Sequence, residues 1–176
     1  FIWKLKLKIK LNNKVVLVTG SSGKIGGYFY NFFKKEKCIV YGIDQVSKRG
    51  NKTFVGNIYD NNFVKNVINK IVRKHKKIDI LINNAGKSVF TKPKKRTLEE
   101  LLSVTNTNLI GTINLINNFL DLNPKRKEYY KIINISSIYG IVSPNFRIYG
   151  KGDNFNSEIY GATKAGIIQF TKYFSV

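Results

Sequence analysis

Residues 15–26 read Val-Val-Leu-Val-Thr-Gly-Ser-Ser-Gly-Lys-Ile-Gly, a short β-branched run that passes directly into glycine-rich sequence. Such a run predicts a fully buried strand, and the glycines predict a tight turn into a helix. We expect Gly20 to adopt the backbone angles of the turn, Gly23 to let the backbone approach a pyrophosphate, and Gly26 to permit close helix–strand packing. Free N–H groups at the start of the helix favour bound phosphate. The stretch therefore predicts a dinucleotide site formed by Gly20, Ser22, Gly23, Lys24, Ile25 and Gly26.

Strand and helix patterns alternate along the rest of the chain. Short apolar runs predict strands at residues 38–43, 53–55, 78–82 and 131–135, and helical spacing predicts helices at 25–33, 63–72, about 97–120 and 158–174. Thr97-Leu-Glu-Glu100 offers a capping box at the start of the long helix. Strands that alternate with helices imply βαβ units and right-handed crossovers. The sequence predicts an α/β fold, a Rossmann-like doubly wound parallel sheet in three α/β/α layers, as a single domain over residues 14–176.

Both ends of the chain are unusual. Residues 1–13 form a basic segment in which apolar residues and Lys alternate up to Leu11, a pattern typical of an exposed edge strand, although a translated leader is also consistent with it. The chain contains no Met, and the last helical pattern runs to the end at Val176 without a capping residue. We therefore expect further sequence at both ends, and a fold that is incomplete at its C-terminal end.

Composition excludes several classes of protein. The 176 residues are 43% hydrophobic and include no apolar run of the roughly 20 residues that a membrane span needs. A single cysteine, Cys38, and a single histidine, His75, argue against a disulfide framework and against a metal site. The net charge of +21 suggests nucleic acid, but Lys outnumbers Arg 26 to 5, as A/T-rich codons would produce. We expect no nucleic-acid partner, no membrane partner and a cytoplasmic location.

Asp44 bears on the choice of cofactor. It ends the second predicted strand, 24 positions after Gly20, about where a carboxylate would hydrogen-bond the adenosine ribose. That carboxylate would repel a 2′-phosphate, which favours NAD over NADP. Lys24, Lys48 and Arg49 are close enough in sequence to accept the phosphate, so NADP remains open.

Tyr160 and Lys164 are the candidate catalytic pair. In Tyr160-Gly-Ala-Thr-Lys164, a phenol and an ammonium are four residues apart on one face of a helix. Free tyrosine is a poor base at neutral pH because its pKa is about 10, and a nearby cation favours the phenolate. Such a tyrosine can take a proton from an alcohol or donate one in the reverse reaction.

Five segments in this order resemble the short-chain dehydrogenase/reductase family. They are Thr19-Gly-Ser-Ser-Gly-Lys-Ile-Gly26, Asn83-Asn-Ala-Gly86, Asn108-Leu-Ile-Gly111, Asn134-Ile-Ser-Ser137 and Tyr160-Gly-Ala-Thr-Lys164. The resemblance implies that Tyr160 is the general acid/base, that Lys164 favours its phenolate and holds the nicotinamide ribose, and that Ser137 hydrogen-bonds the substrate. It also implies a structural role for Ser136, a proton-relay water positioned by Asn108, and cofactor contacts from Asn57, Ile58, Asn84, Ala85 and Gly86. Asn57 replaces an aspartate that is usual in the family.

The resemblance implies an oxidoreductase that transfers a hydride between NAD(H) and a secondary alcohol or ketone, a small-molecule substrate. Ser137 and Tyr160 are 23 positions apart, and the aromatic and polar segment 143–156 between them could contact a sugar derivative. This segment resembles dehydrogenases of flagellin and surface-polysaccharide modification.

Three alternative functions remain. The Thr-Gly-x-x-Gly-x-x-Gly spacing also resembles sugar-nucleotide epimerases and dehydratases. The second alternative is a non-catalytic dinucleotide-binding scaffold, and the third is a basic nucleic-acid binder. The family implies a homo-oligomer, dimer or tetramer, and further strands and a substrate lid beyond this chain, so we expect the chain alone to be inactive or much weakened.

Overall fold

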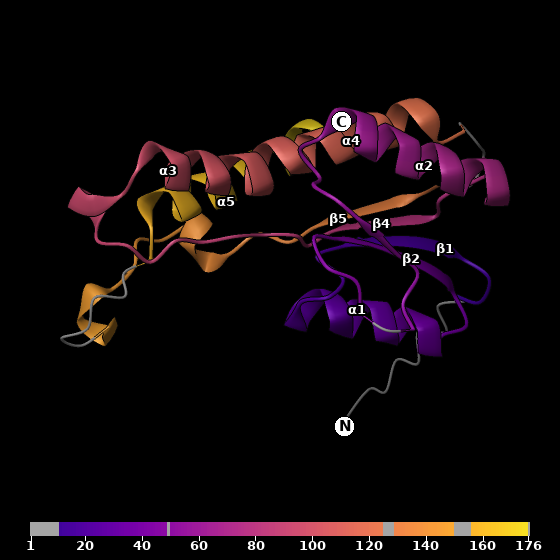
Figure 1. Cartoon of the computed structure of the whole chain (residues 1–176), viewed down its shortest axis with the longest axis horizontal. Coiled ribbons are helices and arrows are strands. Elements are labelled where there is room, and N and C mark those ends of the chain that lie inside the picture. The colour runs from indigo at the N-terminus through magenta and orange to yellow at the C-terminus, as the bar shows by residue number, and fades with distance from the viewer. Residues whose placement is uncertain (1–10, 49, 125–128, 150–155, 176) are drawn as a thin grey trace, which may run out of the picture.

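A five-stranded parallel sheet forms the centre of the molecule, as the computed structural model of the chain shows for residues 11–48, 50–124, 129–149 and 156–175 (Figure 1). The strand order is β3-β2-β1-β4-β5, and all four strand pairs are parallel. The strands are β1 Val15–Thr19, β2 Ile39–Asp44, β3 Thr53–Val55, β4 Ile80–Asn83 and β5 Lys131–Asn134. This arrangement confirms the predicted α/β fold, with each strand within two residues of its expected limits.

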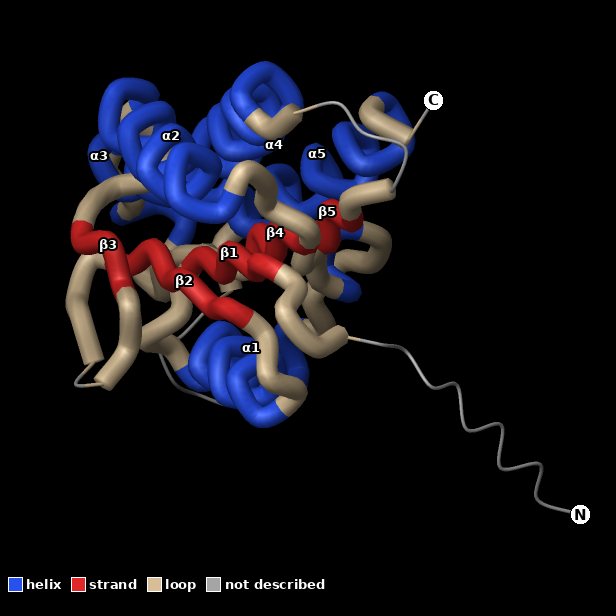
Figure 2. The backbone as a smooth tube through the Cα atoms, turned by 90° about the vertical axis from the view of Figure 1, so that its right-hand side faces the viewer, coloured by secondary structure: helices blue, strands red, loops and turns tan. Residues whose placement is uncertain are grey.

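Helices cover both faces of the sheet, as the three layers in Figure 2 show. Helix α1, Lys24–Lys35, lies on one face, and the other described α-helices lie on the opposite face. These are α2 Asn61–His75, α3 Leu98–Thr105, α4 Gly111–Leu122 and α5 Glu158–Tyr173. The predicted capping box is present, because the Thr97 side chain accepts a hydrogen bond from the Glu100 N–H and the Glu100 carboxylate accepts one from the Thr97 N–H.

Alternate residues of the strands build two apolar cores. Val15 and Leu17 of β1 face α2 and α4, whereas Val16 and Val18 face α1. All four side chains are at most 1% exposed, because helices cover both faces of the parallel sheet. The cores hold the carboxyl ends of β1, β2 and β4 side by side, and the candidate site residues follow these ends.

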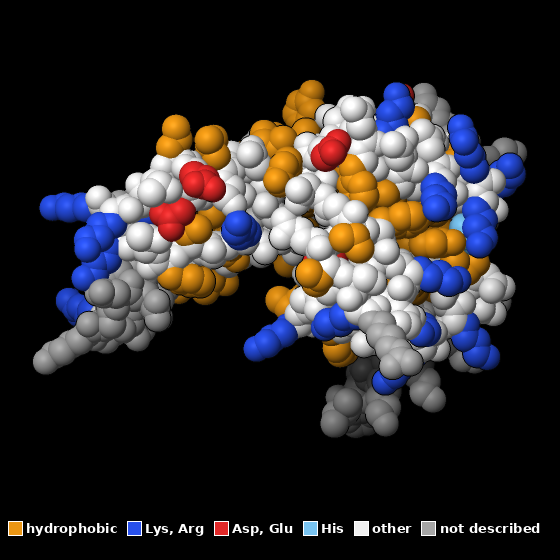
Figure 3. All heavy atoms as spheres, viewed as in Figure 1, with side chains coloured by type: hydrophobic (Ala, Val, Ile, Leu, Met, Phe, Trp, Pro, Cys, Tyr) orange, Lys and Arg blue, Asp and Glu red, His pale blue; other side chains and the backbone are white. Residues whose placement is uncertain are grey.

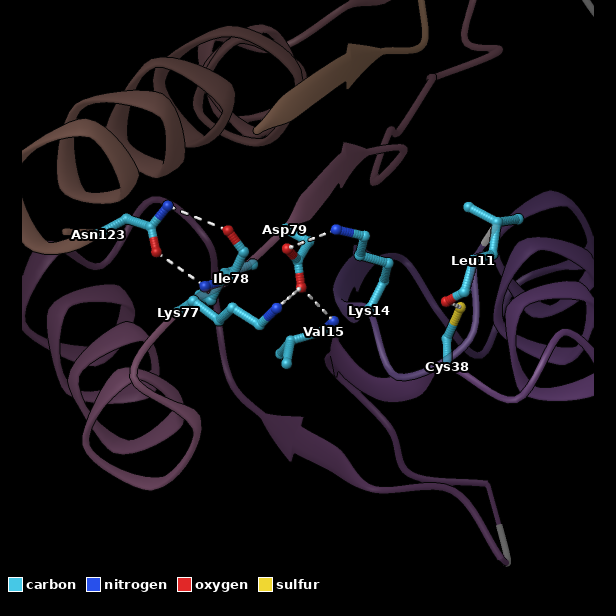
Figure 4. A network of polar contacts seen from close by, with 8 residues as sticks. All are labelled: Leu11, Lys14, Val15, Cys38, Lys77, Ile78, Asp79 and Asn123. Atoms are coloured by element: carbon cyan, nitrogen blue, oxygen red, sulfur yellow. Dashed lines mark hydrogen bonds and ion pairs between the residues drawn. The ribbon is translucent and has the colours of Figure 1, made fainter. Parts of the chain in front are cut away.

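The opposite, amino edge of the sheet is held by a buried carboxylate (Figure 4). Asp79 is 4% exposed, and its Oδ2 accepts a hydrogen bond of 2.7 Å from the Val15 N–H. The ammonium groups of Lys77 and Lys14 lie 3.3 and 3.6 Å from its two oxygens. Next to it, the Asn123 side chain bonds both the N–H and the carbonyl of Ile78. This network joins the end of α4 to the starts of β1 and β4.

The helical stretch predicted from about residue 97 to residue 120 is present, and it has one feature that the sequence did not predict. The stretch is helical, but a π-helical segment, Asn106–Ile110, separates α3 from α4. The wider π turn includes Asn108, whose side chain bonds two other parts of the chain, and apolar spacing in sequence carries no signal for it.

Several predictions fall outside the described residues. These are residues 1–10 of the predicted edge strand, a phosphate contact from Arg49, and residues 150–155 of the segment 143–156. No helix in the described parts of the chain is long and apolar enough to cross a membrane.

Candidate active site

A cleft of about 600 Å³ opens at the carboxyl ends of β1, β2 and β4. The structure brings all twelve predicted cofactor-binding residues to its walls, although they come from four separate segments of the chain. They are Gly20, Ser22, Gly23, Lys24, Ile25, Gly26, Asp44, Asn57, Ile58, Asn84, Ala85 and Gly86. An open parallel sheet places ligands at this edge, where the crossovers on either side of β1 run to opposite faces of the sheet.

The glycine turn at one wall of the cleft has the shape that was expected of it. Gly20 has a φ of +65°, in the left-handed region that favours glycine. A Cβ on Gly26 would lie 2.1 Å from the Gly20 carbonyl oxygen, so any larger residue would force the turn apart. Helix α1 begins at Lys24 after Gly23, with no side chain capping its first N–H groups. These N–H groups remain available to an anion in the cleft.

Asp44 occupies the end of β2 beside this turn. Its Oδ2 accepts a hydrogen bond of 2.8 Å from the Ser22 N–H, and its Oδ1 accepts one of 2.7 Å from the Gln45 N–H. The Ser22 hydroxyl in turn donates to the Val46 carbonyl. The carboxylate is therefore fixed in the wall of the cleft, where its negative charge would repel a phosphate on the adenosine ribose.

Asn57 and Ile58 close the far end of the cleft. The Asn57 Oδ1 accepts a hydrogen bond of 2.7 Å from the Gln45 Nε2, and Ile58 is 6% exposed and belongs to the core between the sheet and α2. This end of the cleft combines an amide pair with an apolar wall.

The loop after β4 forms the wall opposite α1. The Asn84 amide donates to the Thr19 carbonyl at 2.9 Å, and the Thr19 hydroxyl accepts from the Asn84 and Ala85 N–H groups at 3.0 Å each. Because these bonds tie residues 84–86 to the end of β1, the loop is held at a fixed distance from the glycine turn.

A second hollow of about 460 Å³ adjoins the first and contains Ser137, Tyr160 and Lys164. The two hollows share four wall residues, Ile25, Asn84, Gly86 and Lys87. Three of the four predicted catalytic residues thus line a space that continues directly from the predicted cofactor cleft.

Lys164 is the charged group at the centre of this hollow. Its residue is 4% exposed, its Nζ donates to the Ile135 carbonyl at 2.7 Å, and the same Nζ lies 5.7 Å from the centre of the Tyr160 ring. Burial lowers the pKa of the Lys164 ammonium below its ordinary value of 10.5, since desolvation penalises the charged form.

Local contacts explain how Ser137 and Tyr160 come together. The Ser157 hydroxyl caps α5 by accepting a hydrogen bond from the Tyr160 N–H, and the Ser136 hydroxyl donates to the Lys164 carbonyl at 2.7 Å. After Ser137, a short 3₁₀ turn packs so closely on α5 that a Cβ on Gly140 would lie 2.8 Å from the Ala165 nitrogen. The Ser136 bond agrees with the structural role expected of that residue.

Asn108 lies behind the hollow and is 1% exposed. Its Oδ1 accepts from the Lys87 N–H at 2.7 Å, and its Nδ2 donates to the Lys87 carbonyl and to the Thr163 hydroxyl. A Cβ on Gly86 would meet both the Lys164 Nζ, at 3.5 Å, and the Asn108 Oδ1, at 3.7 Å. The side chain therefore supports the loop after β4 and, like the Lys164 ammonium, borders Gly86.

Sequence reasoning missed several wall residues. Gln45, Tyr59 and Thr107 line the first hollow, and Ser88, Phe90, Tyr139 and Asn156 line the second. Most of them follow a recognised motif by one to four positions, a signal that could have indicated them. Asn156 stands four positions before Tyr160 and is 8% exposed. Across the described ranges, no cluster of three His, Cys, Asp or Glu side chains could hold a metal ion.

Comparisons with known proteins agree with this geometry. A family model described as short chain dehydrogenase matches residues 14–176. The 3-oxoacyl-[acyl-carrier-protein] reductase FabG of Thermotoga maritima is 30% identical over 93% of this chain and 68% of that protein. The 3-ketodihydrosphingosine reductase of Bacteroides thetaiotaomicron is 27% identical, over 86% of this chain and 57% of that protein.

Solved structures show the same likeness. A short chain dehydrogenase from Leptospira borgpetersenii with bound NAD+ is 35% identical, with a TM-score of 0.80 over 93% of this chain and 65% of that chain. The aldohexose dehydrogenase of Thermoplasma acidophilum, 24% identical, shares the fold with a TM-score of 0.80 over 93% of this chain and 61% of that chain. The chain thus spans between 57% and 68% of the length of these four proteins.

Proposed function

The chain belongs to the short-chain dehydrogenase family, and from this premise we propose that it binds NAD and carries the catalytic residues of an oxidoreductase for a secondary alcohol or ketone. The observation that carries the proposal is the continuity of the two hollows across Ile25, Asn84 and Gly86. A ligand that extends from the glycine turn past these residues reaches Ser137, Tyr160 and Lys164.

The residues of the cleft fit a dinucleotide. Gly20 and Gly26 let the turn pack closely, Gly23 has no side chain between the backbone and a pyrophosphate, and the uncapped start of α1 presents N–H groups to it. The Asp44 carboxylate would accept hydrogen bonds from the adenosine ribose, and Asn57 and Ile58 would border the adenine. When bound, NAD(H) supplies or accepts the hydride at the reacting carbon.

In this proposal the protein's own chemistry is proton transfer at Tyr160. Its phenolate takes the hydroxyl proton of an alcohol substrate, and in the reverse direction its phenol donates that proton to the ketone oxygen. The Lys164 ammonium, 5.7 Å from the ring centre, stabilises the phenolate by its charge. The Ser137 hydroxyl donates a hydrogen bond to the substrate oxygen and holds it within reach of Tyr160.

Lys164 and Asn108 carry two further roles in the proposal. Lys164 also holds the nicotinamide ribose through its ammonium. Asn108 positions the water that relays protons by way of Lys164, and the position of both side chains beside Gly86 supports this role.

For the substrate, we favour a hydroxylated carbonyl compound, of the sugar-derivative class found in surface-polysaccharide and flagellin modification. The polar side chains of Ser88, Tyr139 and Asn156 at the wall of the second hollow support it, because they can exchange hydrogen bonds with substrate hydroxyls. The names of the two reductases that resemble the chain support a ketone as the reacting group.

A tyrosine substitution tests the proposal in the protein that carries residues 14–176. The Tyr160→Phe variant should lose about 10²- to 10⁴-fold in kcat for NAD-dependent oxidation of a panel of secondary alcohols, the range typical of general acid–base catalysis. Tyr173→Phe, an exposed tyrosine on the same helix, is the matched control and should keep the wild-type rate. Equal measurable rates for Tyr160→Phe and wild type would reject Tyr160 as the acid/base, and no turnover of any alcohol by the wild-type protein would favour a non-catalytic scaffold.

A further inference from the structure

A cationic hollow lies at the amino end of β3, away from the candidate active site. It has a volume of about 310 Å³ and opens between β2, β3 and the last turns of α2. Lys52, Lys70 and Lys74 line it, together with Tyr41 and Phe54. None of these residues borders the glycine-turn cleft or the Tyr160 hollow. Figure 3 shows Lys and Arg side chains gathered around an apolar area at this end of the molecule.

Two aromatic rings hold the lysines toward the hollow. The Tyr41 and Phe54 rings stack with their centres 5.8 Å apart at 25°. The Lys52 Nζ lies 5.8 Å from the Tyr41 ring centre, and the Lys70 Nζ lies 5.6 Å from the Phe54 ring centre. Cation–π attraction at such distances favours ammonium groups that stay at the ring faces rather than extend into solvent.

Within the described parts of the chain, no carboxylate forms an ion pair with the lysines of this hollow. The ion pairs found between described residues use Lys14, Lys77 and Arg96, and none uses Lys52, Lys70 or Lys74. Lys70 and Lys74 stand one helical turn apart, where like charges repel. The positive charge also acts on the neighbouring His75. Burial lowers the pKa of the His75 imidazole, and the ammonium groups of Lys74 and Lys52 lower it further.

Another hollow, of about 540 Å³, continues from the cationic hollow along α2. It shares Lys70 and Lys74 with the cationic hollow and adds Arg73 together with two amide side chains, Asn66 and Asn69. Two adjoining hollows with shared ammonium groups match an anion of two linked phosphates, since each phosphate can accept hydrogen bonds from both lysines.

We propose that these two hollows form an anion site for the diphosphate group of a small phosphorylated molecule, separate from the coenzyme cleft. A single-stranded nucleic acid fits less well, because it requires aromatic faces open to its bases. Here Tyr41 is 8% exposed, and the rings cover one another and carry ammonium groups.

Amide shifts in ¹⁵N-labelled protein during titration with inorganic pyrophosphate, at about 0.15 M salt, test the site residue by residue. We expect saturable shifts at residues 51–54 and 66–74, whatever happens at residues 20–26. The Lys70→Gln, Lys74→Gln double variant should bind pyrophosphate at this site about tenfold more weakly, since it loses two charge-assisted contacts. The matched control is Lys34→Gln, Lys35→Gln, two exposed lysines at the end of α1, which should bind as wild type does.

Three results would overturn the proposal. The first is a set of shifts confined to residues 20–26, which would assign the anion to the coenzyme cleft alone. The second is an equal loss in both double variants, or shifts that grow linearly without saturation, which would indicate non-specific attraction to a basic surface. The third is saturation of residues 51–54 and 66–74 by a short single-stranded oligonucleotide but not by pyrophosphate.

Discussion

Asp79 offers a quantitative test of how the sheet is held together, through the substitution Asp79→Asn. The amide keeps the shape of the side chain and can still accept the Val15 N–H, but the 2.7 Å bond loses its charge, which costs about 1 kcal/mol. The ion pairs to Lys14 and Lys77, whose side chains are 34% and 35% exposed, each contribute about 0.5 kcal/mol. The free energy of unfolding should therefore fall by about 2 kcal/mol, equivalent to a decrease in Tm of roughly 4–8 °C for a domain of this size.

Urea denaturation followed by circular dichroism measures this loss. Asp79→Ala should lose about 3–4 kcal/mol, because it also leaves the buried Val15 N–H without an acceptor. Asp121→Asn, which changes an exposed carboxylate at the end of α4, is the matched control and should be neutral within about 0.5 kcal/mol. A loss of less than about 0.5 kcal/mol in Asp79→Asn would contradict this, since the buried carboxylate would then contribute nothing to stability through its charge.

Three further substitutions have specific expected outcomes. Ser137→Ala should lower kcat about 10²-fold in steady-state kinetics, because it removes a donor to the substrate oxygen. Ser136→Ala should leave kcat nearly unchanged and lower the free energy of unfolding, measured in urea, by about 1 kcal/mol. A larger loss of kcat in Ser136→Ala than in Ser137→Ala would reverse the two assignments. Asp44→Asn keeps an acceptor for the Ser22 N–H but removes the negative charge. The ratio of NADH affinity to NADPH affinity should therefore fall about tenfold in fluorescence titrations. An unchanged ratio would show that the charge of Asp44 does not select the cofactor. Burial and the Lys74 and Lys52 ammonium groups lower the pKa of His75 below 6.5, so the native state binds fewer protons than the unfolded state and stability should fall as pH decreases through 6.5. In His75→Phe, the urea midpoint should change less between about pH 7 and pH 5 than it does in wild type. The same pH dependence of the midpoint in both proteins would contradict this.

The fold could be predicted closely because local sequence and global structure agree. The β-branched run at 15–18 is buried on both faces, and Thr97 forms the expected capping box. The site could be predicted where its residues stand in short motifs at strand ends, because parallel strands bring their carboxyl ends to one edge. That rule alone places Gly20, Asp44 and Asn84 around one cleft.

Features that depend on contacts between distant segments could not be predicted. The π segment at 106–110 arises where the Asn108 side chain bonds Lys87 and Thr163, which are 21 and 55 positions away. The cationic hollow likewise combines Lys52, before β3, with Lys70 and Lys74 of α2. Apolar periodicity and motif spacing describe neighbours along the chain, so they contain no information on such pairs.

The most direct test of the account is a titration of the chain with NADH, followed by cofactor fluorescence at about 0.15 M salt, with NADPH in parallel. We expect both cofactors to bind saturably to one site, with NADH the tighter. We expect that binding to be lost in Gly26→Val, whose side chain would enter the space beside the Gly20 carbonyl. No saturable binding of NADH, or tighter binding of NADPH than of NADH, would contradict it.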